Sequence, residues 1–209
     1  MKLSFDLTAF SSIQELCQAS LACTDCELSR NRTQVVPGEG SPSADVLFIG
    51  EGPGYHEDQQ GRPFVGPSGK FLDELIASIG YTRADVYIAN VVKCRPPGNR
   101  DPTPVEIEAC SKWLDGQIEH IKPKVIVTLG RYSLAKFMSG ETISKIHGKA
   151  RQVGDYVVMP VYHPAAALYQ QSLRQTIEED FKKIPSLLQG SEPAPAPADE
   201  PKPEQLSLF

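Results

Sequence analysis

Four short runs of apolar, largely β-branched residues recur through the middle of the chain. Each run is long enough for a buried strand and too short for an ordinary buried helix. They predict strands at residues 45–50, 86–92, 124–130 and 156–164. Asn90 lies near the end of the second run and His163 near the end of the fourth, and the first runs directly into a glycine-rich turn.

The segments between these runs place apolar residues at helical spacing. They predict helices at residues 69–80, 104–121, 131–138 and 165–184. Strands that alternate with helices indicate an α/β fold, which we expect to be a three-layer α/β/α domain around a central, mainly parallel, four-stranded sheet. In such a sheet, ligands bind at the carboxyl ends of the strands.

The composition fits one globular domain, which we place at residues 1–189 of the 209. No run of about 18 apolar residues is present, and the N-terminal segment lacks the apolar centre of a secretory signal. We therefore expect a cytoplasmic protein. The formal net charge is −5, but the last twenty residues contribute −3 of it, so the body is nearly neutral and a local basic face that binds nucleic acid is compatible with it.

The end of the chain changes character twice. Residues 190–204 are rich in Pro and Ala, which form neither helix nor sheet ladders, and this predicts a disordered, extended linker. The chain then ends in QLSLF, residues 205–209. Three large apolar side chains after a solvated tether suggest a peptide that binds a partner protein, with folding back onto its own domain as the alternative.

The five cysteines suggest a metal site. In a cytoplasmic chain they argue against a disulfide framework. Cys23 and Cys26 form a CxxC pair, Cys94 and Cys110 lie far downstream, and Cys17 is left over. A chelating pair closed by two distant thiolates suits a four-cysteine metal site. Scattered buried thiols are the alternative.

The glycine-rich turn GEGPGYHED follows the first predicted strand. It does not match the dinucleotide fingerprint, because Pro53 and three acids disturb both its spacing and its charge. Glycines also let the backbone approach a flat ligand closely. Acids beside a neutral heterocycle can orient a water molecule or stabilise positive charge that develops on a sugar.

Three long motifs and the four paired cysteines carry a family resemblance. GEGPGYHEDQQGRPFVGPSG, IANVVKCRPPGNR and VYHPAAAL (residues 50–69, 88–100 and 161–168) closely resemble the family 4 uracil-DNA glycosylases, the iron–sulfur branch. The resemblance covers about residues 21–184. It implies a monofunctional enzyme that flips uracil out of DNA, hydrolyses its N-glycosidic bond and so starts base-excision repair.

The resemblance assigns roles in the uracil pocket. Phe64 would stack on the flipped base, and the Asn90 amide matches O4 and N3–H of uracil and rejects cytosine. His163 would stabilise negative charge on O2 of the leaving base. Gly52 and Gly54 would let the backbone approach the ring. Another branch of the superfamily carries a catalytic Asp at what corresponds to Gly52, so catalysis here depends more on the leaving group.

Several roles stay open at this point. Glu51 is the better candidate for activating water and Glu57 for shaping the pocket, but either carboxylate suits either task. Leu168 would wedge into the gap left by the base, or else is the first core residue of the last helix. Ser68 lies at a helix start that suits a phosphate. Further phosphate contacts are expected from Arg95, Arg100, Lys145, Lys149 and Arg151, while His56, His120 and His147 are expected at the surface.

Cofactor and partners follow from the same resemblance. Cys23, Cys26, Cys94 and Cys110 would hold a structural [4Fe-4S] cluster, with zinc as the rival because four thiolates suit either. QLSLF resembles the peptide by which bacterial repair proteins bind the sliding clamp, through Gln205, Leu206, Leu208 and Phe209. We expect a nucleoid-associated monomer that acts on uracil-containing DNA.

Two other functions compete with the glycosylase at this stage. One is an iron–sulfur module that senses damage or redox state by binding DNA without cutting it. The other is a flavodoxin-like protein that binds a nucleotide or flavin, which the strand and helix order alone allows but the acidic turn opposes.

Overall fold

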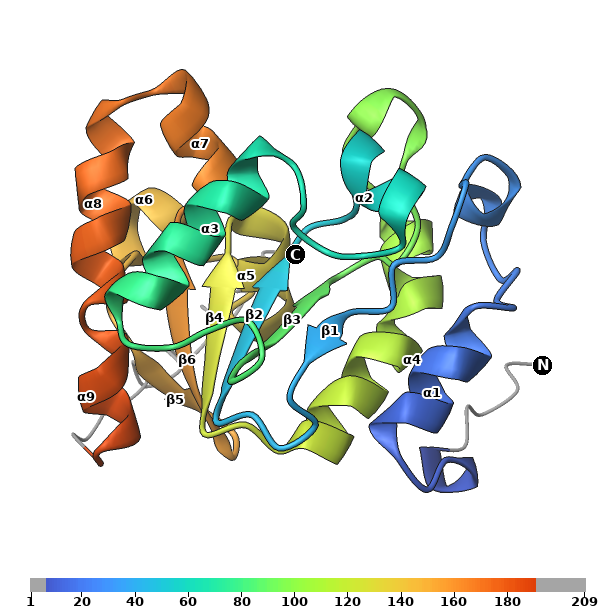
Figure 1. The fold of residues 1–209 in the computed structure, drawn as a ribbon, viewed down its shortest axis with the longest axis horizontal. Helices are drawn as coiled ribbons and strands as arrows, with labels where there is room; N and C mark the ends of the chain where they lie inside the picture. The colour runs from blue at the N-terminus through green and yellow to red at the C-terminus, as the bar shows by residue number, and fades with distance from the viewer. Residues whose placement is uncertain (1–6, 191–209) are drawn as a thin grey trace, which may run out of the picture.

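The computed structural model describes residues 7–190 and is built around a six-stranded sheet (Figure 1). The strand order is β1-β3-β2-β4-β6-β5. The four inner strands are parallel, and each begins within one residue of its predicted start. They are β2 (Val46–Gly50), β3 (Tyr87–Asn90), β4 (Val125–Leu129) and β6 (Tyr156–Val161). The α/β class and the mainly parallel core are confirmed.

The prediction of a four-stranded sheet is wrong at both edges. Strand β1 (Glu39–Gly40) pairs antiparallel with β3, and β5 (Arg151–Val153) pairs antiparallel with β6. These strands have only two and three residues, and their side chains are partly or fully exposed. Neither contains an apolar run, so hydrophobic patterning gave no signal for them.

Helices cover both faces because alternate residues of each inner strand point to opposite sides. In β2, Leu47 and Ile49 belong to one core cluster, which includes side chains of α1, α4 and α5. Val46 and Phe48 belong to the other, which is formed with α3, α8 and α9. The helices are α1 (Ile13–Ser20), α2 (Tyr55–Gln60), α3 (Pro67–Ser78), α4 (Pro104–Ile121), α5 (Arg131–Phe137), α6 (Ile143–Ile146), α7 (Pro164–Tyr169), α8 (Ser172–Phe181) and α9 (Ile184–Leu188). The three-layer prediction is confirmed.

Helix α4 has the bounds expected from its sequence, and its start shows why. Thr103 is the N-cap residue and Pro104 takes the first helical position. The Thr103 hydroxyl accepts from the Glu106 amide at 3.3 Å, while the Glu106 carboxylate accepts from the Thr103 amide at 2.7 Å. This capping box satisfies two amides that the helix itself leaves free.

The single helix predicted over residues 165–184 is wrong. The segment forms three helices, α7, α8 and α9, which turn at residues 170–171 and 182–183. Helix α7 packs against both α3 and α8, and these contacts set its direction separately from that of the helices that follow it. The sequence between Ala165 and Ile184 contains neither Gly nor Pro, so it offers no local signal for these breaks.

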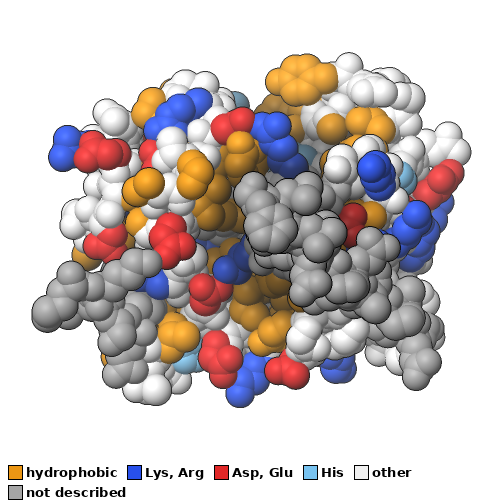
Figure 2. All heavy atoms as spheres, turned by 180° about the vertical axis from the view of Figure 1, so that it is seen from behind, with side chains coloured by type: hydrophobic (Ala, Val, Ile, Leu, Met, Phe, Trp, Pro, Cys, Tyr) orange, Lys and Arg blue, Asp and Glu red, His pale blue; other side chains and the backbone are white. Residues whose placement is uncertain are grey.

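Seen from behind, the described part of the surface carries acidic and basic side chains side by side, with hydrophobic side chains in hollows between them (Figure 2). A groove on the α4 and α5 side is lined by Val91, Ile107, Leu114 and Ala135. The main cavity lies elsewhere, at the carboxyl edge of the sheet. No helix between residues 7 and 190 has the length and apolar character needed to cross a membrane.

Candidate active site

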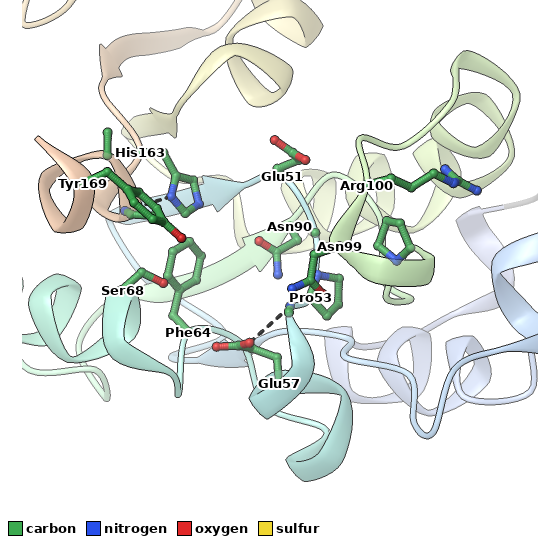
Figure 3. Close-up of a pocket in the computed structure, with 15 residues that line it drawn as sticks. Glu51, Pro53, Glu57, Phe64, Ser68, Asn90, Asn99, Arg100, His163 and Tyr169 are labelled. Atoms are coloured by element: carbon green, nitrogen blue, oxygen red, sulfur yellow. Dashed lines mark hydrogen bonds between the residues drawn. The ribbon is translucent and has the colours of Figure 1, made fainter.

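A cavity of about 420 Å³ lies at the carboxyl edge of the parallel strands. It gathers segments that are far apart in sequence: the loop after β2, the end of β3 and the start of α7 (Figure 3). The residues predicted to meet here do line it, namely Glu51, Gly52, Gly54, Glu57, Phe64, Ser68, Asn90, Arg100 and His163. Its size suits a small ligand such as a nucleobase.

Phe64 forms one wall and is held in an unusual backbone conformation. Its φ is 52°, which is uncommon for a residue other than Gly. Its ring is 5% exposed and stacks on the His163 imidazole, with centroids 5.5 Å apart. A Cβ on Gly50 would lie 2.6 Å from the Phe64 ring, and one on Gly69 would lie 1.9 Å from its carbonyl oxygen. Glycine is therefore required at both positions, because Phe64 approaches the backbone there too closely to leave room for a side chain.

Asn90 is the last residue of β3 and pairs in register with Gly50. It is 2% exposed, yet its side chain lines the cavity. Within residues 7–190 the side-chain amide of Asn90 has no hydrogen-bond partner, although buried side-chain amides usually have one. The side chain therefore has both a donor and an acceptor available for a ligand.

His163 is the N-cap residue of α7, and this fixes its tautomer. Its Nδ1 accepts a hydrogen bond from the Ala165 amide at 3.1 Å. In the neutral ring the proton then lies on Nε2, which remains a donor. Desolvation lowers the pKa of His163 to about 4, with a smaller opposing effect from Glu57. The imidazole is thus neutral near pH 7.

The two glutamates of the turn have different settings. Both carboxylate oxygens of Glu57 accept backbone hydrogen bonds, Oε2 from Gly54 at 3.1 Å and Oε1 from Val65 and Gly66 at 2.9 Å each. Within the described chain, the Glu51 carboxylate makes no hydrogen bond. Burial and then the charge of Asp101 raise its pKa. Glu57 therefore holds the loop, whereas Glu51 remains available.

Four cysteines line a second, small cavity, which Lys93, three residues after Asn90, also lines. Cys23 and Cys26 come from the loop before a 3-10 turn (Glu27–Arg30), Cys94 from the loop after β3, and Cys110 from α4. The fifth, Cys17, does not line this cavity; its sulfur lies 3.4 Å from the Tyr87 hydroxyl. The four cysteines predicted to share one site are therefore the four that line this cavity.

Two of these sulfurs accept N–H hydrogen bonds, but burial raises the pKa of Cys26, Cys94 and Cys110 and so favours their protonated thiols. The Arg32 guanidinium donates to Cys94 Sγ, and the Lys93 amide donates to Cys110 Sγ, both at 3.2 Å. Burial raises the pKa of Cys110 to about 12, so a metal would have to displace its proton. Among residues 7–190, no group of three or more Cys, His, Asp or Glu side chains is placed to hold a single metal ion. Four thiols lining one cavity are the donor type of a sulfur-ligated centre, although in the described chain they are not arranged as a closed set of ligands.

A family model described as the uracil DNA glycosylase superfamily matches residues 37–187. This span contains every residue that lines the main cavity. The chain belongs to this superfamily.

Curated relatives narrow the family further. A type-4 uracil-DNA glycosylase of Sulfurisphaera tokodaii is 50% identical over 186 residues, covering 84% of this chain and 84% of the relative. Those of Archaeoglobus fulgidus and Thermotoga maritima are 47% and 48% identical, covering 87% and 79% of this chain and 96% and 89% of their own lengths. The chain is therefore a type-4 member of the superfamily, as its motifs predicted.

The residues predicted to contact DNA in this glycosylase differ in their exposure and in whether they already have partners within the fold. Leu168 is 51% exposed on α7, which rules out a core position for it. Ser68 is the second residue of α3, as expected. The Arg100 guanidinium is engaged by the Glu106 carboxylate at 2.7 and 2.9 Å, and lowers the pKa of Glu106 to about 2. In Figure 3 it extends away from the cavity centre.

Three of the other predicted cations, Arg95, Lys149 and Arg151, also have partners within the fold. Arg95 donates to Asn99 at 2.7 Å and lies over the Tyr55 ring. Arg151 pairs with Glu141, and Lys149 Nζ donates to the Lys145 carbonyl. Their phosphate contacts stay a prediction.

Sequence reasoning missed two groups near the cavity. Tyr169 lines it and is 92% exposed, and Asn99 lines it from the 3-10 turn Pro97–Asn99. For Tyr169, its place next to Leu168 was the only available signal.

The surface prediction for His147 is wrong, because its Nδ1 lies 2.7 Å from the buried Asp180 carboxylate. His120 is also partly buried, and only His56 is exposed.

Proposed function

We propose that the chain is a monofunctional uracil-DNA glycosylase that flips uracil from DNA, hydrolyses its N-glycosidic bond and starts base-excision repair. The supporting observation is that Phe64, Asn90 and His163, from three separate segments, line one cavity. An aromatic ring, a free amide and a neutral imidazole are the groups needed to stack on a pyrimidine, read its edge and stabilise it as a leaving group.

Base recognition depends on Phe64 and Asn90. Stacking on Phe64 would contribute about 1–3 kcal/mol for any base. Selectivity comes from Asn90, whose amide N–H would donate to O4 and whose oxygen would accept from N3–H. Cytosine presents the opposite polarity at these two positions, so it would leave the buried amide unpaired, and an unpaired buried amide costs about 1–3 kcal/mol.

The chemical step divides between His163 and Glu51. As the bond from C1′ to N1 breaks, its electron pair goes to uracil, and Nε2–H of His163 donates to O2, where negative charge collects. Water adds to C1′ and loses its proton, which balances the proton that uracil takes up. Glu51 holds that water and stabilises the positive sugar, because its carboxylate is free. Glu57 shapes the pocket through its backbone contacts.

The base leaves the duplex with help from residues around the rim. Leu168 would fill the gap in the base stack, a role favoured by its exposure. Ser68, Arg95, Arg100 and Lys149 would contact phosphates, which fixes the position of the strand without reading its sequence.

The decisive experiment is incubation with an oligonucleotide that contains one uracil, followed by alkali to cleave abasic sites. The protein should yield free uracil and one cleavage product, and His163→Ala and Asn90→Ala should each lose most activity with unchanged thermal unfolding. A matched control is His56→Ala, whose side chain is exposed and outside the cavity. Binding without release of uracil would favour the DNA-sensing module instead.

We further propose that Cys23, Cys26, Cys94 and Cys110 hold a [4Fe-4S] cluster. The cluster would brace the loop that joins the cysteine cavity to Asn90. Two sulfurs already accept N–H donors, as thiolate ligands do. Anaerobically purified protein should be brown and contain about four irons per chain. Cys110→Ala should lose this absorbance and Cys17→Ala should keep it; colourless protein with one zinc would contradict the cluster.

The clamp peptide, residues 205–209, and the linker before it from residue 191 onwards lie outside the described residues. We propose that QLSLF fills a groove on the bacterial sliding clamp, because Gln and three apolar side chains follow a Pro- and Ala-rich segment that would reach about 45 Å if extended at ~3.1 Å per residue. Deleting residues 205–209 should abolish clamp binding in a pull-down and leave cleavage of short oligonucleotides unchanged. The enzyme would then act as a tethered monomer at the nucleoid, and equal clamp binding by the truncated chain would contradict this.

A further inference from the structure

Lys93 lies between the two cavities and is completely enclosed. Among residues 7–190 it is the one lysine whose side chain is buried, at 1% exposure. Burying an ammonium group is costly unless it is well satisfied by partners. Within the described chain it contacts no carboxylate, so ordinary ion pairing does not explain its position.

The Lys93 side chain is satisfied by two neutral acceptors. Nζ donates to the carbonyl oxygen of Asn90 at 2.9 Å and to Oε1 of Gln117, on α4, at 2.6 Å. Gln117 is itself fixed, because its Nε2 donates to the Pro37 carbonyl at 2.6 Å. The ammonium therefore ties the end of β3 to a rigid point on α4.

The backbone of Lys93 belongs to the cysteine cavity. Its amide donates to Cys110 Sγ at 3.2 Å, its carbonyl accepts from Val36 at 2.8 Å, and Cys94 is the next residue. The residue also lines that cavity. One residue thus contacts the sulfur site through its backbone and Asn90 through its side chain.

We propose that Lys93 is a positioning residue: its backbone is anchored at the cysteine cavity, and its side chain sets the Asn90 side-chain amide for uracil. The carbonyl that Lys93 binds is part of the peptide plane next to the Asn90 side chain. Without this donor the Asn90 carbonyl loses one anchor, while the Val91 amide of the same peptide still donates to the Gly50 carbonyl at 3.0 Å. The plane then tilts about that remaining hydrogen bond, and the Asn90 side-chain amide shifts away from the base. This inference rests on the proposed uracil recognition.

The experiment compares Lys93→Met with Lys182→Met, an exposed lysine after α8. Both are purified anaerobically and assayed for metal content, visible absorbance, equilibrium binding of free uracil, and kcat and KM on a single-stranded uracil oligonucleotide. Lys93→Met should keep the absorbance and bind uracil about tenfold more weakly, a loss of ~1.4 kcal/mol. Because Asn90 binds the base before and during the reaction, KM should rise more than kcat falls.

Gln117→Leu provides the second test if Lys93→Met fails to fold. It leaves the bond between Lys93 and Asn90 in place but removes the anchor of the ammonium, so uracil binding should weaken about threefold with metal content unchanged. If Lys93→Met folds and binds uracil as tightly as the wild type, the inference is overturned. If Lys93→Met does not fold, wild-type uracil affinity in Gln117→Leu overturns it. A variant that loses stability but keeps its affinity for uracil also overturns it. A wild-type protein that releases no uracil would overturn the proposed function instead.

Discussion

Arg83 holds Phe64 by its backbone, because its Nη1 donates to the Phe64 carbonyl oxygen at 3.2 Å. The same guanidinium donates to the Pro63 carbonyl at 2.6 Å and pairs with Glu39 and Asp73. Phe64 has a positive φ, a conformation that costs about 1–3 kcal/mol and persists only when its surroundings enforce it. Arg83 is therefore a support for the ring that would stack on uracil.

Replacing Arg83 should loosen that ring. In Arg83→Met, two backbone carbonyls lose their donor, and kcat/KM on a uracil oligonucleotide should fall about tenfold, mainly through KM. Arg83→Lys should recover little, since one ammonium cannot copy the planar fork. The control is Arg62→Met, which loses an exposed ion pair to the same Glu39. Equal effects of Arg62→Met and Arg83→Met would mean that the contacts to Glu39, and not those to the loop, matter.

Glu57→Gln tests whether Glu57 acts through the backbone. The substituted amide can still accept from Val65 and Gly66, but its NH₂ group would face the Gly54 amide, which then loses its acceptor. Leaving a fully buried donor unsatisfied costs about 1–3 kcal/mol, and the Gly54 amide is part-buried, so the urea midpoint of unfolding should drop modestly and kcat/KM should fall about tenfold. Glu119→Gln, at an exposed position on α4, is the control. Full stability with no activity would instead indicate a chemical role for the carboxylate.

The sequence predicted those parts of the fold that local patterns encode. The inner strands are continuous apolar runs, and α4 carries both a capping box and a helical apolar face, so each was found with close bounds. The strands β1 and β5 are held by pairing with β3 and β6, and the break at Gln170 and Gln171 is set by packing. Such tertiary effects leave no local pattern in the sequence.

The same distinction applies to the site. Phe64, Asn90 and His163 could be predicted because each belongs to a long motif, and Asn90 and His163 also lie at or just after the end of a strand. The contribution of Arg83 depends on contacts between segments about twenty residues apart, which no spacing rule indicates. Glu51 and Glu57 could not be told apart by sequence, because the difference lies in three backbone amides that fold around only one of them.

The raised pKa of Glu51 predicts the acid side of the pH profile. Burial holds this pKa above its ordinary value of 4.5, so Glu51 takes up a proton and loses its charge as pH falls through that raised value. His163, with a pKa of about 4, stays neutral over the same range. Single-turnover cleavage should therefore slow as pH drops from 7 towards 4.5. Glu51→Gln should be slower at pH 7 but nearly flat over this range; an unchanged acid limb would assign it to another group.

Leu168→Ala separates base flipping from catalysis. The side chain is 51% exposed, so its removal should leave thermal unfolding unchanged. A wedge matters only where a base is drawn from a stacked duplex, and more so for a stable U:A pair than for a U:G mismatch. Activity should therefore fall about tenfold on U:A duplex, less on U:G, and little on single strands. Leu21→Ala, at a residue 43% exposed after α1, should change none of these. An equal loss on all three substrates would show that Leu168 contacts the uracil or the sugar and does not act as a wedge.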